Sequence, residues 1–230
     1  CRKINYGKMI SFANVTFGYQ NKEIFENTSL EVKKGEFVFL VGESGIGKTT
    51  LLKLIHFELS PKTGSVAFEN YNSGTIDRTE IPMLRRKMGF VFQDFKLLND
   101  RNIFENIAVP LYITGEKKET IKKKVFDISS KLGLMEHMKD MPFDISGGEQ
   151  QRAAIARAMI TEPVLLLADE PTGNLDPFVA LDIIKLLNDI NKTGTTMIIA
   201  THNFEIVKKF SDKRILQIKD KNLVDVRVKT

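Results

Sequence analysis

The most constraining feature of this 230-residue sequence is a glycine-rich segment that lies between an apolar run and a helix-like stretch. Residues 42–49 read Gly-Glu-Ser-Gly-Ile-Gly-Lys-Thr, which matches the phosphate-loop pattern G-x-x-x-x-G-K-[ST]. The preceding run, Phe37–Val41, is typical of a strand buried on both faces, and the following leucines have helical spacing. This order of strand, loop and helix predicts a nucleotide-binding α/β fold.

The residue types in this loop suit the binding of a nucleoside triphosphate. Glycines let backbone N–H groups approach phosphates closely, and the next helix directs its N-terminal dipole at the same anions. Lys48 is expected to reach the β- and γ-phosphates, and the Thr49 hydroxyl is expected to coordinate Mg²⁺. The predicted ATP-binding residues here are Gly42, Glu43, Ser44, Gly45, Ile46, Gly47, Lys48, Thr49 and Thr50.

The rest of the chain alternates between strand-like and helix-like segments, which predicts a mainly parallel core sheet. Apolar residues alternate with polar ones near residues 10–17 and 30–32, which indicates strands at the start. The middle, from about Asn102 to Leu134, is helical and looks like an insertion. In the final third we expect helices at 148–160, 177–190 and 204–210 and strands at 164–168, 196–200, 214–218 and 223–228.

A second polar site follows the apolar run 164–168, where Asp169 and Glu170 stand together. In open α/β sheets, ligands bind at the carboxyl ends of the strands. Asp169 is therefore expected to hold Mg²⁺, directly or through water, and Glu170 is the candidate base that polarises the attacking water. A strand that ends in two acids is a weak signal alone, but it becomes strong beside a phosphate loop.

A third segment, Ile145-Ser146-Gly147-Gly148-Glu149, offers another anion cradle at a helix start. This segment resembles the signature of the ATP-binding cassette (ABC) ATPases, which is usually written LSGGQ. Residues 9–228 as a whole resemble that family. The order of the motifs also agrees: phosphate loop, Gln93, signature, acidic pair, Asp176 and His202. The resemblance implies a P-loop NTPase fold of the ABC type, with a mainly parallel core sheet, an antiparallel β subdomain and an inserted α-helical subdomain.

The resemblance also implies that the ATP site is shared between two copies of the chain. In this family, two subunits meet head to tail about a twofold axis and hold two ATP molecules between them. By this resemblance, Ser146, Gly147 and Gly148 of one subunit would bind the γ-phosphate that is bound to the partner's Lys48. Glu149 is also among the implied ATP-binding residues.

Four further roles follow from the same resemblance. Gln93 would contact Mg²⁺ or water, and His202 would hydrogen-bond the γ-phosphate and position the water. Tyr19 would stack on adenine, and Asp176 would lie near the nucleotide. The implied catalytic residues are Lys48, Gln93, Glu170 and His202, and the implied metal ligands are Thr49, Gln93 and Asp169.

Within the family, Glu149 and residues 170–176 are similar to the branch that contains the FtsE, LolD and MacB ATPases. Residues 92–108, which include Asp94-Phe95 and Asp100-Arg101, resemble the FtsE group most. This implies a cell-division role with a transmembrane partner of the FtsX kind, which regulates peptidoglycan hydrolases, at the cytoplasmic face of the bacterial inner membrane. The alternative is a LolD-like or MacB-like export ATPase.

Composition argues against two further classes, membrane-spanning proteins and nucleic-acid-binding proteins. The apolar runs reach five residues, whereas a membrane helix needs about 20, so any membrane contact is expected to be peripheral and through the partner. Residues 208–230 hold eight Lys or Arg and three Asp, which accounts for the whole net charge of +5. This weak basicity does not favour nucleic-acid binding. Residues 9–230 are predicted to form one ABC ATPase domain with a helical subdomain at about 95–160, and residues 1–8 are an N-terminal extension or not native.

Overall fold

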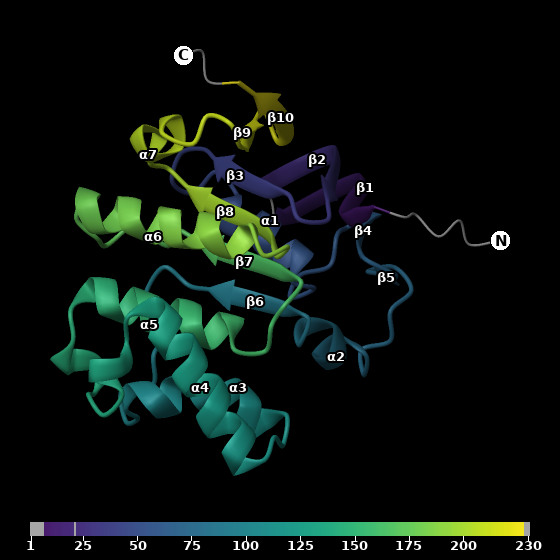
Figure 1. The fold of residues 1–230 in the computed structure, drawn as a ribbon. Helices are drawn as coiled ribbons and strands as arrows, with labels where there is room; N and C mark the ends of the chain where they lie inside the picture. Colours follow the sequence, from purple (N-terminus) through teal and green to yellow (C-terminus); the bar gives the residue numbers. More distant parts are fainter. Residues whose placement is uncertain (1–6, 21, 228–230) are drawn as a thin grey trace.

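The computed structural model describes residues 7–20 and 22–227, which form two sheets and the helices that cover them (Figure 1). Of the predicted N-terminal extension, residues 1–6 lie outside the described residues, and Lys8 begins the first strand, β1 (Lys8–Tyr19). Val228 of the last predicted strand also lies outside them. The strand that ends the described part of the chain is β10 (Asn222–Val226).

The core is a six-stranded sheet with the order β10-β9-β3-β8-β7-β6. The strands β9, β3, β8, β7 and β6 pair in parallel, and β10 pairs antiparallel with β9 at the edge. This mainly parallel arrangement confirms the predicted fold class. The strands are β3 (Phe37–Val41), β6 (Met88–Val91), β7 (Leu165–Asp169), β8 (Thr196–Thr201) and β9 (Arg214–Lys219).

A second, antiparallel sheet has the order β2-β1-β4-β5. Besides β1, its strands are β2 (Lys22–Lys33), β4 (Thr63–Phe68) and β5 (Tyr71–Asn72). The apolar residues of β1 skip a position between Phe12 and Val15, and the pairing with β2 shifts register at the same place. Asn14, within this gap, adopts a left-handed conformation with φ 49°, so a β-bulge keeps both apolar residues on the buried face.

Helices cover both faces of the core sheet. The antiparallel sheet and α1 (Lys48–Ile55) pack on one face, where alternate strand residues such as Val38, Leu40, Leu165 and Leu167 point. The intervening residues, such as Phe39 and Leu166, point into a second cluster with the other helices. These are α3 (Ile103–Ile113), α4 (Lys118–Leu132), α5 (Gly147–Met159) and α6 (Pro177–Asn191). The short helices α2 (Ile81–Arg85) and α7 (Phe204–Lys208) complete the list.

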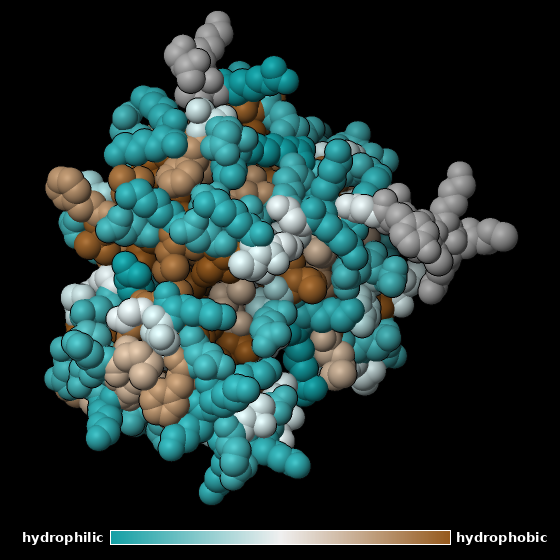
Figure 2. Space-filling view, viewed as in Figure 1, coloured by the Kyte–Doolittle hydropathy of each residue, from teal (hydrophilic) through white to brown (hydrophobic). Residues whose placement is uncertain are grey.

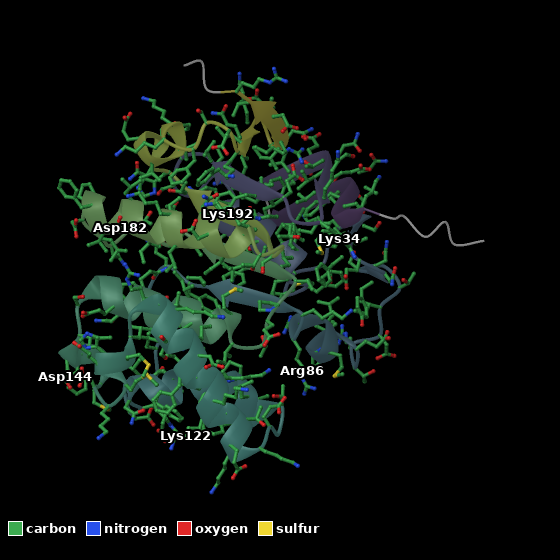
Figure 3. The ribbon with its side chains drawn as sticks, in the orientation of Figure 1. Lys34, Arg86, Lys122, Asp144, Asp182 and Lys192 are labelled. Carbon is green, nitrogen blue, oxygen red and sulfur yellow. The ribbon has the colours of Figure 1, made fainter. Side chains whose placement is uncertain are left out.

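The predicted helical insertion is present as α3, α4 and α5, which lie together at the bottom of Figure 1. The stretch predicted to be helical, about 102–134, consists of the two helices α3 and α4, because the chain turns at Gly115 with φ 73°. Ile121, Val125 and Leu132 of α4 are buried, as their spacing predicts. Lys118, Lys122 and Lys123 of α4 are exposed, and Lys122 points away from the fold in Figure 3. The subdomain boundaries at about 95 and 160 stay a prediction.

The far end of α5 rests directly on the backbone of β6. A Cβ atom added to Gly89 would lie 2.5 Å from the carbonyl oxygen of Ala158 and 2.8 Å from Leu166 Cδ1. The oxygen belongs to the main chain of α5, so a side chain at position 89 would have to move the helix. Glycine at this position thus permits the closest approach of the helical insertion to the core sheet.

We expect Gly89→Ala to destabilise the protein by about 1–3 kcal/mol, the usual cost of overpacking a filled interior. Urea unfolding would measure the loss. The matched control is Gly74→Ala, because the nearest atom to an added Cβ there is the side-chain oxygen of Asn72 at 3.3 Å. Equal stability of the two variants would contradict the proposed close approach.

Candidate functional site

The predicted site residues converge because three neighbouring parallel strands end at the same edge of the core sheet. The phosphate loop follows β3, His202 follows β8, and Asp169 ends β7. The strand β8 lies between the other two, with Val41 paired to Thr201 and Asp169 paired to Ala200. The loop, the acidic pair and the histidine, which are far apart in the sequence, therefore face one another.

The phosphate loop takes a compact path that requires glycine at its end. Gly47 has φ 123°, a conformation that L-residues with side chains rarely adopt. A Cβ atom there would also lie 2.5 Å from Ile24 Cγ2 of β2. The antiparallel sheet therefore packs directly against the loop, and α1 begins at the next residue, Lys48.

Lys48 is the centre of the loop's polar contacts. Its ammonium donates to the carbonyl oxygens of Gly42 at 2.8 Å and Glu43 at 3.1 Å. It also forms an ion pair with Glu170 Oε1 at 3.1 Å, and both side chains are buried, with exposures of 6% and 8%. In this state, a carboxylate of the protein occupies the place beside the lysine where an anionic ligand would bind.

Glu170 connects Lys48 to His202. The second carboxylate oxygen, Oε2, lies 2.9 Å from His202 Nδ1 and accepts a hydrogen bond from the His202 backbone N–H at 3.2 Å. Glu170 has φ 48°, a left-handed conformation that is uncommon for a residue other than glycine. This strained backbone turns the carboxylate back over the loop, between the lysine and the histidine.

Thr49 and Asp169 form the part of the site that suits a divalent cation. The Thr49 hydroxyl donates to Asp169 Oδ2 at 2.7 Å, while the buried Oδ1 has no hydrogen-bond partner among the described residues. Burial raises the pKa of Asp169, with a further rise from Glu170, against the lowering by Thr49 and the nearby lysines. An unpartnered carboxylate oxygen beside a hydroxyl is a donor set that Mg²⁺ accepts when substrate phosphates supply further ligands.

A cavity of about 270 Å³ opens beside the loop. Tyr19 stands at its mouth, 47% exposed, and its ring packs edge-on against Phe17 with centroids 5.1 Å apart. The predicted residues that line the cavity are Tyr19, Gly45, Gly47, Lys48, Thr49, Thr50, Asp169 and Glu170.

The predicted signature residues do not line this cavity. Ser146 is exposed and caps α5 in a reciprocal capping box. Its hydroxyl oxygen accepts a hydrogen bond from the Glu149 backbone N–H, and the Glu149 carboxylate accepts one from the Ser146 backbone N–H. Gly148 lies against α6, where an added Cβ would be 2.8 Å from Val179 Cγ1. Asp176 caps α6 by accepting hydrogen bonds from the N–H groups of Phe178 and Val179. The signature and Asp176 thus form a neighbouring surface instead of contributing to the same pocket.

Gln93 also lies outside the cavity lining, in the exposed turn after β6. Its carbonyl accepts a hydrogen bond from Asn174 Nδ2 at 3.3 Å. The following loop is held in place by Arg157 of α5, whose guanidinium donates to the carbonyls of Phe95 and Lys96. The segment therefore connects the turn at Gln93 to the helix that begins at the signature.

Three contacts of the site have no signal in the sequence pattern. Lys22 and Ile24 line the cavity because they face the loop from β2, across the β1–β2 hairpin. His137 contacts Glu149 from the 3₁₀ turn Met135–His137, with Nε2 3.0 Å from Glu149 Oε1. Tertiary contacts, which no local sequence motif encodes, place these residues: strand pairing for Lys22 and Ile24, and the packing of a 3₁₀ turn for His137.

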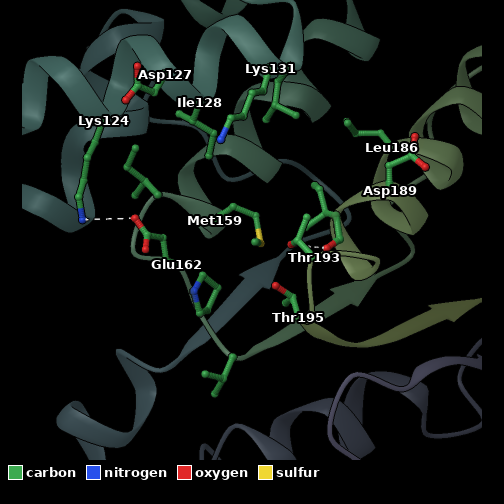
Figure 4. A pocket seen from close by; sticks show the side chains of 16 residues that line it. Lys124, Asp127, Ile128, Lys131, Met159, Glu162, Leu186, Asp189, Thr193 and Thr195 are labelled. Atoms are coloured by element: carbon green, nitrogen blue, oxygen red, sulfur yellow. Dashed lines mark hydrogen bonds and ion pairs between the residues drawn. The ribbon is translucent and has the colours of Figure 1, made fainter.

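A larger cavity of about 700 Å³ lies elsewhere, between α4, the end of α5 and the end of α6 (Figure 4). Its apolar wall includes Ile128, Met159 and Leu186, and an ion pair joins Lys124 to Glu162 at 3.7 Å. Figure 2 shows brown apolar surface between these helices, bordered by teal polar residues. None of the predicted site residues belongs to its lining.

Among the described residues, none of the helices has the length and apolar character that a span requires.

Comparisons with known proteins agree on one family. The family described as ABC transporter matches residues 25–173. The cell division ATP-binding protein FtsE of Bacillus subtilis (strain 168) is 43% identical over 213 residues, which cover 92% of this chain and 93% of that one. FtsE of Escherichia coli (strain K12) is 39% identical over 216 residues, with 94% and 97% covered. A solved dimeric structure of the ATP-binding cassette MJ0796, in a post-hydrolysis state bound to ADP and Pi, superposes with a TM-score of 0.84 at 32% identity and covers 96% of this chain and 100% of that one.

We expect Lys48→Ala to weaken both folding and ATP binding. Removal of one partner of a buried ion pair leaves an uncompensated charge, at a cost of about 3–5 kcal/mol in the free energy of unfolding. The double variant Lys48→Ala/Glu170→Gln should regain much of that stability without regaining affinity for ATP. Urea unfolding and calorimetric titration with ATP would measure the two quantities.

Two results would contradict this account. Equal stability of the single and double variants would remove the energetic role of the Lys48–Glu170 pair. Normal ATP affinity in either variant would contradict the assignment of the phosphate loop.

Proposed function

The chain belongs to the ABC transporter family and is an ATPase of the ABC type, and from this we propose that it is the ATP-hydrolysing subunit of an FtsEX-like membrane complex in bacterial cell division. In this role, ATP-driven dimerisation acts on a transmembrane partner that regulates peptidoglycan hydrolysis. The protein works at the cytoplasmic face of the inner membrane, to which the partner holds it. The similarity to FtsE over more than nine-tenths of both chains supports this choice.

The position of Glu170 between Lys48 and His202 is the main support for a role in ATP hydrolysis. When the γ-phosphate binds, it competes with Glu170 for the Lys48 ammonium, since both anions need the same cation. The released carboxylate is then free to accept a proton from the attacking water. His202, already next to Glu170, positions the water and the γ-phosphate.

Mg²⁺ supplies charge neutralisation for the phosphates when it is bound. Thr49 and Asp169 would hold it, the first by its hydroxyl and the second by Oδ1, which lacks another partner. Gln93 would approach the same ion from its turn after β6. Tyr19 stacks on adenine at the mouth of the cavity.

The active assembly in this proposal is a head-to-tail homodimer with two shared ATP sites. Two features support it: the loop cavity is open, and the Ser146 end of α5 is exposed at a separate surface. In a twofold dimer, each of these surfaces meets the other on the second copy. Ser146–Glu149 and Asp176 then reach the nucleotide on the opposite subunit. Residues 9–230 act as one ABC ATPase domain, with about 95–160 as its helical subdomain.

The membrane partner docks, we infer, on the segment 92–98, which includes Gln93. Asn106 of α3 is fully buried and holds this segment through hydrogen bonds with both backbone groups of Leu98. Two apolar side chains, Phe92 and Leu98, remain 36% and 41% exposed there. A rigid backbone with exposed apolar side chains suits a permanent protein contact. Through Arg157, the same segment can transmit movement to α5.

We expect Glu170→Gln to bind ATP yet hydrolyse it very slowly, because the amide cannot act as a base. An ATP-dependent dimer should then accumulate, detectable by gel filtration and by steady-state phosphate release. Unchanged turnover would remove Glu170 from its role.

Mixing Ser146→Arg protein with Lys48→Ala protein tests whether the site is shared between subunits. Each mixed dimer can contain at most one intact site. Activity equal to that of the wild type would therefore contradict the head-to-tail arrangement.

We expect Leu98→Glu to abolish co-purification of an FtsX-like transmembrane protein from membranes, since a charge is placed in an apolar contact. The matched control is Met83→Glu on α2, before β6, where the side chain is 57% exposed. ATP binding should be normal in both variants. Equal recovery of the partner by both would contradict docking at this segment.

A further inference from the structure

His137 lies between two carboxylates at the start of the signature helix. Its Nε2 is 3.0 Å from Glu149 Oε1, and its Nδ1 is 2.9 Å from Asp140 Oδ2. A neutral imidazole carries one N–H and one lone pair, so it can donate to only one of these oxygens. Both contacts are satisfied together only when both ring nitrogens are protonated. The geometry therefore selects the imidazolium form.

The Glu149 carboxylate that contacts His137 also binds Ser146. Its other oxygen, Oε2, accepts hydrogen bonds from the Ser146 hydroxyl at 2.7 Å and from the Ser146 backbone N–H at 2.8 Å. A continuous chain of contacts thus runs from Asp140 through His137 and Glu149 to Ser146. The orientation of the Ser146 hydroxyl depends on a carboxylate whose position and charge depend on His137.

The charge at this end of α5 is unfavourable for an anionic ligand. Hydrogen bonds from Ser146 lower the pKa of Glu149, which keeps it ionised. The hydrogen bond to Asp140 raises the pKa of His137 against the effect of burial, and the negative charges of Glu149, Asp140 and Glu136 raise it further. All the charged groups that act on the ring are carboxylates, so His137 is the cation that contacts Glu149.

We propose that His137 is a positioning residue for the signature segment: as an imidazolium it neutralises Glu149, so that Ser146–Gly148 can receive the γ-phosphate of an ATP molecule bound to the second copy. The proposal rests on the shared ATP site proposed above. Without the cation, a bare Glu149 carboxylate would stand beside the incoming phosphate and repel it.

The sign of the pH dependence follows directly. The pKa of His137 is raised above its ordinary value of 6.5, so the imidazolium is complete below that value and is lost as the pH rises through the raised pKa. ATP-dependent dimerisation should weaken over the same range. The loss should reach at most about 25-fold, because each dimer contains two such sites and one partly exposed ion pair contributes a factor of up to about five.

The experiment measures ATP-dependent dimerisation by analytical ultracentrifugation, in the slowly hydrolysing Glu170→Gln background, from about pH 6 to about pH 8.5. His137→Lys keeps a cation throughout this range and should dimerise with little pH dependence beyond that of ATP itself. His137→Gln can donate a hydrogen bond but carries no charge, and it should dimerise weakly at every pH. Glu149→Gln removes the charge that needs neutralising and should make dimerisation insensitive to the residue at position 137.

The outcomes separate this inference from the proposed function. If Glu170→Gln fails to dimerise with ATP at any pH, the shared site is wrong and the role of His137 falls with it. If it dimerises and His137→Gln retains the pH profile of the parent, only the inference is overturned. ATP binding to the monomer should be equal in the His137 variants, and His137→Gln should lose no more thermal stability than its two partly exposed ion pairs supply. A loss of the fold would change both quantities.

Discussion

The site depends on one interaction, the buried contact between Lys48 and Glu170. A lysine ammonium is costly to bury, and here three acceptors compensate it: two carbonyls of its own loop and a carboxylate from β7. The same carboxylate reaches His202 after β8. The three strand ends are therefore joined electrostatically before any nucleotide arrives. In the proposed mechanism, a triphosphate replaces Glu170 beside the lysine, so ligand binding and release of the candidate base are one event.

The fold was predictable where burial imposes a period on the sequence. The strands Phe37–Val41 and Leu165–Asp169 are buried on both faces, and continuous apolar runs encode them. The helix α4 shows its buried stripe at spacings of three and four. The prediction was less complete where geometry is local and irregular. The bulge at Asn14, the break at Gly115 and the short α2 are set by turns and tertiary contacts, which periodicity does not report.

The residues of the site were likewise predictable where a local motif encodes them and not where tertiary contacts place them. The phosphate loop is a continuous segment whose own residues predict its chemistry. Of the nine residues predicted there, Gly45, Gly47, Lys48, Thr49 and Thr50 line the cavity, whereas Gly42, Glu43, Ser44 and Ile46 do not. The side of the cavity formed by Ile24 arises from pairing across a hairpin, and the contact of His137 with Glu149 arises from a 3₁₀ turn folded against a helix start. Gln93, Ser146–Glu149 and Asp176 stand outside the cavity of a single copy, so a single chain leaves their roles as proposals.

The contact of Gly89 with the end of α5 has a mechanical consequence. The helix has 13 residues and is therefore about 20 Å long. Ala158, near its end, touches the sheet backbone without an intervening side chain, which makes that point a natural pivot. A rigid rotation of about 10° there would carry the Ser146 tip through about 3 Å, roughly the length of a hydrogen bond. Arg157, one residue from the pivot, holds the loop after Gln93. If the proposed membrane partner displaces that loop, Arg157 would transmit the displacement to α5 close to its contact with Gly89, and the movement would be largest at the signature end of the helix.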